Sequence, residues 1–118
     1  MIVALIPGYN EGPRIGDVVR VAVAHLPVLV VDDGSSDDTA IRAREAGATV
    51  IDQRPNQGKG AALRAGFRRA LADGADAVLT LDADGQHDPA EIPAFLAAWS
   101  AGPPPPDLVI GQIGRAHV

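Results

Sequence analysis

The sequence contains no cysteine and few aromatic residues, and each shortage excludes a class of protein or site. Without cysteine the chain forms no disulfide, binds no metal through thiolates and has no cysteine nucleophile. Aromatic residues make up 3% of the 118 residues and hydrophobic residues 47%, so the core must be built from Ala, Val, Leu and Ile. The length suits one domain and is too short for two.

Basic residues and long apolar runs are also scarce. Ten Lys and Arg against fifteen Asp and Glu give a formal net charge of −5. Binding to nucleic acid needs a basic surface, so we expect no nucleic-acid partner. No run approaches the roughly 20 apolar residues of a membrane helix, and the apolar start at Ile2–Pro7 lacks the basic leader of a signal peptide. These absences predict a small, acidic, cytoplasmic domain.

Short apolar runs alternate with helix-like stretches along the chain. Continuous apolar runs suit parallel strands that are covered on both faces, and repeated strand–helix–strand units predict right-handed crossovers. The expected fold class is α/β, a Rossmann-like three-layer α/β/α arrangement with a mainly parallel sheet. The expected strands are residues 2–6, 28–31, 48–51, 77–81 and 107–110. The expected helices are residues 15–25, a stretch from Ser36 or Asp37 to Gly47, 60–72, and a stretch from Asp88–Pro89 to about Gly102.

Acidic residues follow two of the predicted strands, at the edge of a parallel sheet where ligands bind. Asp82 and Asp84 are two residues apart and can direct both carboxylates at one hard divalent cation, Mg²⁺ or Mn²⁺, with Gln86 close by. The same pair would also suit a solvated loop. Asp32 and Asp33 follow the strand at 28–31. They either belong to an ordinary turn and helix cap, or one of them accepts hydrogen bonds from a nucleobase.

A glycine-rich segment, Asn56–Gly60, precedes the third expected helix but does not match the phosphate-binding loop of nucleoside triphosphatases. That motif needs glycine where Gln53 stands and Ser or Thr where Gly60 stands. Lys59 either offsets diphosphate charge or is a solvated lysine at a helix start. Tyr9 is the only tyrosine and follows the first strand, where its ring would pack beside a base or ribose.

Taken in order, these segments resemble the nucleotide-binding half of the family 2 glycosyltransferases, which have the GT-A fold. The resemblance covers about Ile2 to Gly111 and is strongest to the branch related to dolichyl-phosphate mannose synthase, which transfers a sugar to a polyprenyl phosphate. It is carried by IPGYNE at 6–11, VVDDGSSDDT at 30–39, NQGKGA at 56–61 and LDADGQHDP at 81–89.

The resemblance implies a metal-assisted, inverting transfer of a sugar from a UDP- or GDP-sugar to a polyprenyl phosphate or glycan. It implies that Asp82 and Asp84 bridge Mg²⁺ or Mn²⁺ to the donor diphosphate, with Gln86 as a further ligand. The residues implied to bind the nucleotide sugar are Pro7, Tyr9, Glu11, Val31, Asp33, Lys59, Asp82, Ala83 and Asp84.

The chain also departs from the family. Members continue well beyond this length, and their second half supplies acceptor contacts and the general base. The family often has Gly-Ser-Arg after the fifth strand, whereas Gln112 follows Gly111 here. We therefore expect residues 1–111 to be the donor-binding part and residues 112–118 to be a non-native tail that resembles a translated sequencing adapter. The catalytic base, and any membrane association, would come from the missing C-terminal region.

Three alternatives stay open. A sugar-nucleotide nucleotidyltransferase shares the layout but favours a glycine-rich, basic segment after the first strand, where Tyr9-Asn10-Glu11 stands. A phospho-acceptor receiver domain needs its acidic pair after the first strand, whereas the acids here follow the second and fourth. A non-catalytic nucleotide-binding remnant is the third.

Overall fold

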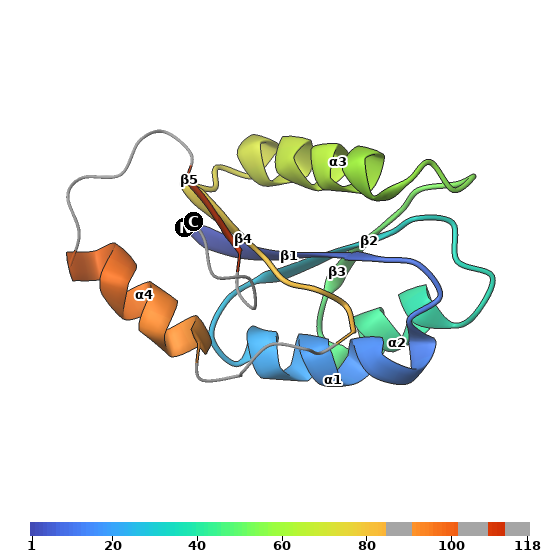
Figure 1. The fold of residues 1–118 in the computed structure, drawn as a ribbon, viewed down its shortest axis with the longest axis horizontal. Helices are drawn as coiled ribbons and strands as arrows, with labels where there is room; N and C mark the ends of the chain where they lie inside the picture. Colours follow the sequence, from blue (N-terminus) through green and yellow to red (C-terminus); the bar gives the residue numbers. More distant parts are fainter. Residues whose placement is uncertain (85–90, 102–108, 113–118) are drawn as a thin grey trace.

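The computed structural model describes residues 1–84, 91–101 and 109–112, which form alternating strands and helices (Figure 1). The strands are β1 (Ile2–Gly8), β2 (Val28–Asp32), β3 (Thr49–Asp52), β4 (Ala77–Thr80) and β5 (Val109–Gln112). The helices are α1 (Gly12–Val23), α2 (Thr39–Ala46), α3 (Lys59–Ala72) and α4 (Glu91–Ala101).

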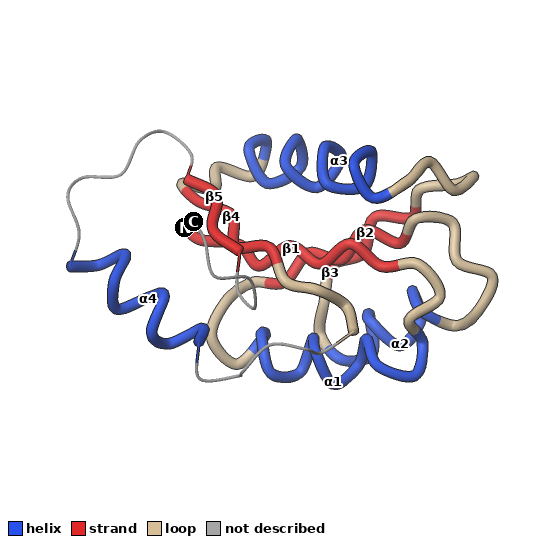
Figure 2. Tube along the Cα trace, viewed as in Figure 1, coloured by secondary structure: helices blue, strands red, loops and turns tan. Residues whose placement is uncertain are grey.

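The described strands form one sheet in the order β3-β2-β1-β4-β5, and every neighbouring pair is parallel. Helices α1 and α2 cover one face and α3 covers the other (Figure 2). The structure therefore confirms the expected α/β class and its three layers. The order of the strands reverses at β1, because β2 and β3 lie on one side of it and β4 and β5 on the other.

The core consists of two apolar layers, one on each face of the sheet. Successive side chains of a strand point to opposite faces. Accordingly, Ala4 and Ile6 of β1 pack in the layer toward α1, and Val3 and Leu5 pack in the layer toward α3. Helix α3 approaches the sheet closely at Gly66, where a Cβ atom would lie 2.3 Å from Cδ1 of Leu5. Small and β-branched residues thus replace aromatics in the core, as the composition predicts.

The first strand is longer than expected, because it continues through Pro7 and Gly8. Proline lacks the N–H group of a strand ladder, and for this reason the sequence predicts that the strand ends at Ile6. The carbonyl of Gly8 accepts a hydrogen bond from Asp33 N–H on the β2 side. Because bonding alternates along a strand, the missing N–H of Pro7 faces β4 instead. Strand β4 ends at Thr80 and Leu81 N–H still donates to the carbonyl of Leu5, so Pro7 lies where the pairing of β1 with β4 stops.

Two helix starts also differ from the sequence prediction. Helix α1 begins at Gly12 rather than at residue 15, since Pro13 occupies its first turn, where a missing N–H costs little. Helix α2 begins at Thr39 with Asp38 at the N-cap position, but the side chain that accepts from the N–H of Thr39 is that of Asp37. Gly47 ends α2 as predicted, with a φ of 115° in the left-handed region.

Several predicted features lie outside the described residues. They are the Gln86 ligand, the helix start at Asp88–Pro89, the helix end near Gly102, the start of the fifth strand at Asp107 and most of the tail at 112–118. In the described ranges, no helix has both the length and the apolar character needed to cross a membrane.

Candidate functional site

Two adjoining cavities lie at the carboxyl edge of the sheet, and Pro7, Tyr9 and Lys59 line both of them. The first has a volume of about 130 Å³ and is completed by Gly8, Asp33 and Ala62. The second has a volume of about 210 Å³ and is completed by Glu11, Asp82, Ala83 and Asp84. The second cavity lies where β1 and β4 end, at the point where the strand order reverses, and ligands of open parallel sheets bind at such points.

Most of the residues that the sequence predicted for the site line one of these two cavities. Val31 is the exception among the described residues, because it is fully buried in the apolar layer under α3. Its side chain packs in the core and does not reach the surface of the site. Gln86 lies outside the described residues.

Asp33 is 4% exposed, and its carboxylate accepts hydrogen bonds from the loop at residues 53–58. The four donors are Gln53 Nε2 at 3.0 Å, Gln57 N at 2.8 Å, Asn56 Nδ2 at 3.2 Å and Gly58 N at 2.8 Å. Burial by itself raises the pKa of Asp33, but the bonds from Gln57, Gln53 and Gly58 outweigh it, so that this pKa lies below its usual value.

The hydrogen bonds to Asp33 change the role expected for it. Two donors contact each carboxylate oxygen, which fills the roughly four lone-pair positions of the group. The carboxylate has no position left for a nucleobase in this arrangement. Asp33 instead fixes the loop that leads into Lys59, and it forms part of the wall of the first cavity.

The loop after β1 is fixed by the loop after β2. Asn10 N–H donates to Ser35 Oγ at 2.8 Å, and Asn10 Oδ1 accepts from Ser36 N–H at 2.8 Å. Asn10 has a φ of 52°, a left-handed conformation that Asn tolerates better than most residues. These two hydrogen bonds hold the neighbouring residues Tyr9 and Glu11 at the cavities. Tyr9 is 51% exposed and is accessible to a ligand.

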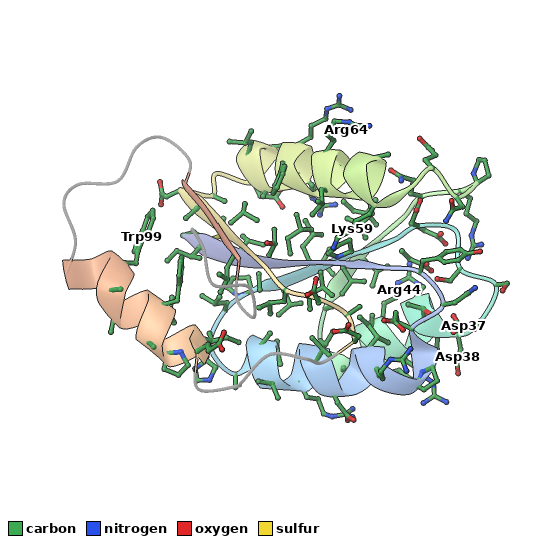
Figure 3. All side chains as sticks on the ribbon, viewed as in Figure 1. Asp37, Asp38, Arg44, Lys59, Arg64 and Trp99 are labelled. Atoms are coloured by element: carbon green, nitrogen blue, oxygen red, sulfur yellow. The ribbon has the colours of Figure 1, made fainter. Side chains whose placement is uncertain are left out.

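Asp37 joins the starts of two helices. Its Oδ2 accepts from Gly12 N–H at 3.1 Å, and its Oδ1 accepts from Thr39 N–H at 3.0 Å and from the Thr39 hydroxyl. Burial by itself raises the pKa of Asp37, but the hydrogen bonds from Thr39 and Gly12 lower it by more, so that this pKa lies below its usual value. The labelled side chain is seen beside the starts of α1 and α2 (Figure 3).

Charges of both signs surround the second cavity. Lys59 Nζ lies 3.5 Å from Asp82 Oδ1. Arg14 forms an ion pair with Glu11, and the pKa of Arg14 is raised first by the hydrogen bond and the charge of Glu11 and further by the charge of Asp84. The sequence reasoning missed Arg14, although its position three residues after Glu11 on one helix turn is a signal for such a pair.

Arg54 is a second residue that the sequence reasoning missed. Its guanidinium donates to Ser35 O at 2.9 Å and pairs with Asp52 at 3.0 Å. It also lies 3.9 Å from Oδ2 of Asp32, a fully buried oxygen with no hydrogen-bond partner. Arg54 therefore connects the ends of β2 and β3.

The acidic residues of the second cavity fit a metal ion that is shared with a ligand. In the described part of the chain, no group of three or more His, Cys, Asp or Glu residues is placed to hold a metal. Asp82 and Asp84 do line one cavity together. Mg²⁺ is commonly bound by one or two carboxylates together with substrate phosphates, and the pair suits that kind of site.

Known proteins resemble this chain in sequence. The chain is 37% identical over 119 residues to the undecaprenyl-phosphate mannosyltransferase of Micrococcus luteus, covering 94% of this chain and 47% of that protein. It is 38% identical over 117 residues to the polyprenol monophosphomannose synthase of Mycolicibacterium smegmatis, covering 92% of this chain and 43% of that protein. The chain thus spans less than half the length of these two relatives.

Solved structures resemble its fold. The glucosyl-3-phosphoglycerate synthase of Mycobacterium tuberculosis superimposes with a TM-score of 0.70 at 29% identity, over 86% of this chain and 42% of that one. The same enzyme has been solved with Mn²⁺, UDP and glucosyl-3-phosphoglycerate, with a TM-score of 0.67 at 28% identity, over 86% of this chain and 40% of that one. The family model described as "Glycosyl transferase family 2" matches residues 3–117. The resemblance drawn from the four sequence segments is thereby confirmed, and the chain belongs to glycosyl transferase family 2.

Proposed function

We propose that this chain is the donor-binding part of a glycosyltransferase that moves a sugar from a UDP- or GDP-sugar to a polyprenyl phosphate or glycan, with inversion at the anomeric carbon. The observation that carries the proposal is the pair of adjoining cavities at the reversal of strand order, one of them lined by Asp82 and Asp84. Relatives named for transfer to polyprenyl phosphates support the acceptor class.

The first cavity is assigned to the nucleoside. Tyr9 offers an exposed ring against which a base or ribose can pack, and Pro7 and Ala62 offer apolar contact. Asp33 contributes by holding the loop that carries Lys59, because its own acceptor positions are filled. The base of the donor, uracil or guanine, is therefore selected by other groups of the cavity.

The second cavity is assigned to the diphosphate and a divalent cation. Asp82 and Asp84 would hold Mg²⁺ or Mn²⁺, with Gln86 proposed as a further ligand. When bound, the cation supplies stabilisation of the negative charge that builds on the departing nucleoside diphosphate. Lys59 adds a positive charge beside the same position, and Glu11 and Ala83 also line the cavity. A solved relative that contains Mn²⁺ together with UDP supports this assignment.

The remaining parts of the reaction are assigned outside this site. We assign donor binding to residues 1–111. We assign the general base and the acceptor contacts to a further segment of the enzyme, which corresponds to the additional length of the relatives. The expected property of residues 1–118 is therefore metal-dependent donor binding with little or no turnover.

Thermal melting tests this proposal. The chain is heated with UDP-sugars and with GDP-sugars, each in Mn²⁺ and in chelator. A donor at about a hundred times its Kd adds about 2.7 kcal/mol, which raises the Tm of a domain of this size by about ten degrees. We expect a rise with one nucleotide class only, and only when Mn²⁺ is present.

A pair of variants identifies the carboxylates that are responsible. Asp84→Asn should abolish the donor-dependent rise and keep a cooperative melt. The matched control is Asp73→Asn, which changes the same charge at the end of α3, where Asp73 pairs with exposed Arg69. A wild-type melt that ignores every donor, or an Asp84→Asn variant that keeps the full rise, would contradict the assignment.

A further inference from the structure

Lys59 occupies an unusual position between the two cavities. It is the first residue of α3, it lines both cavities, and its Nζ lies 3.5 Å from Asp82 Oδ1. In Figure 3 Lys59 lies on the side of α3 that faces the sheet, whereas Arg64 of the same helix points away from it. The ammonium group of Lys59 thus lies beside the carboxylate of Asp82.

An ammonium group and a divalent cation compete for one carboxylate. Both neutralise the same charge, and they repel each other at short range. The Lys59–Asp82 pair is weak enough to be exchanged, since the Lys59 side chain is 58% exposed and that of Asp82 is 20% exposed. Lysine suits such an exchange, because its charge is compact and its stem is flexible.

The diphosphate of a donor would give Lys59 a second partner. The lysine already borders both cavities, so a rotation of its side chain is enough to turn Nζ from Asp82 toward a ligand that spans them. Its backbone is held meanwhile, because the preceding Gly58 and Gln57 donate their N–H groups to Asp33 at 2.8 Å. The backbone at Lys59 is therefore fixed, while the charged end of its side chain can move.

We propose that Lys59 is a built-in counter-ion of Asp82, which opposes metal binding while no donor is present and moves to the donor diphosphate when one binds. The inference rests on the proposed function and adds a consequence to it. Metal and donor bind cooperatively, and Lys59 is a source of the coupling. By linkage, each ligand then raises the affinity for the other by the same factor.

Binding of Mn²⁺ alone tests the first half of this inference. Free Mn²⁺ is measured by electron paramagnetic resonance in titrations of the wild type and of the Lys59→Met, Lys59→Arg and Arg64→Met variants. Loss of an exposed ion pair corresponds to a factor between roughly 1.4 and 5, so Lys59→Met should bind Mn²⁺ more tightly by a factor in that range. Lys59→Arg keeps the charge and Arg64→Met removes one on the far side of α3, so both should match the wild type.

Binding of UDP and GDP in saturating Mn²⁺ tests the second half. Lys59→Met should weaken binding of the preferred nucleotide, so that the same substitution changes the two affinities in opposite directions. Circular dichroism melts establish that each variant is folded. If Lys59→Met binds Mn²⁺ no more tightly than Arg64→Met does, the competition is refuted, whatever the nucleotides do. If neither nucleotide binds to the wild type in Mn²⁺, the proposed function fails, and the Mn²⁺ titration still decides whether Lys59 opposes the metal.

Discussion

The carboxylate of Asp33 accepts hydrogen bonds from four groups of the loop at 53–58 and must be ionised to accept all of them. These bonds hold the pKa of Asp33 below its usual value in spite of burial. A folded-state pKa below the unfolded value of about 3.9 means that the group adds stability above that pH. The contribution is lost as the pH falls through the folded-state pKa.

Replacement of Asp33 by Asn should therefore destabilise the fold in a pH-dependent way. An amide directs an NH₂ group at donors that need an acceptor, which costs about 2 kcal/mol. We expect urea unfolding to show this deficit undiminished from neutral pH down to about 5, and to show it shrinking below the unfolded pKa of about 3.9. Asp17→Asn, which alters an exposed carboxylate paired with Arg20, is the control. A deficit that stays constant down to acid denaturation would mean that the bonds do not depend on the charge.

The sequence identified Asp33 as a site residue but not its role. The signal was an acidic pair directly after a buried strand, and this position is indeed at the first cavity. The donors that fill its carboxylate come from residues 20 to 25 positions later in the chain. Their arrangement depends on the path of the loop after β3, which no local pattern encodes. The same limit applies to Arg14, whose pairing with Glu11 is local but whose approach to Asp84 is not.

At the scale of elements, Asp37 couples α1 to α2 by accepting from the first N–H of each helix. We expect Asp37→Ala to lower the free energy of unfolding by about 2 kcal/mol, at the upper end for helix caps, because two helix starts lose an acceptor. Its neighbour offers a sharp comparison. Asp38 stands at the N-cap position of α2 but makes no capping bond there, and it forms an exposed pair with Arg42.

Asp38→Ala should then cost only a few tenths of a kcal/mol in the same thermal or urea unfolding experiment. Equal losses for the two variants would show that the capping bonds of Asp37 contribute nothing beyond a surface charge. The comparison also bears on the site, because α1 follows directly on Glu11, whose N–H donates to Thr39 Oγ1 at 3.0 Å.

The types of the elements were predictable, whereas their ends were less so. Apolar periodicity marks the buried part of a helix, and in α1 that stripe begins at Ile15. The first turn, Gly12-Pro13-Arg14, is polar or small and is held by Asp37 from a distant loop, so the pattern could not include it. Likewise Pro7 looked like the end of a strand, and only the early end of β4 makes it acceptable inside one.

At the scale of the whole molecule, the strand order creates the site. Strands β2 and β3 follow one another on one side of β1, and the chain then crosses over so that β4 pairs with the other side of β1. This crossing brings the loops after β1 and β4 together, and with them Glu11, Asp82 and Asp84. Repeated strand–helix units predicted a parallel sheet but not this order of strands. The order depends on which strands pair with β1, and local sequence patterns do not encode that.

Among the residues that the structure describes, those that line the two cavities lie between residues 7 and 84. Deletion of residues 112–118 should therefore leave the donor-dependent rise in Tm unchanged, measured as the difference between melts with and without donor in Mn²⁺. The basal Tm should fall slightly, because Gln112 pairs with Thr80 at the edge of the sheet. A truncated chain that melts cooperatively but has lost the rise would place a required residue within 112–118. The assignment of donor binding to residues 1–111 would then be wrong, and those seven residues would have to be counted as part of the enzyme.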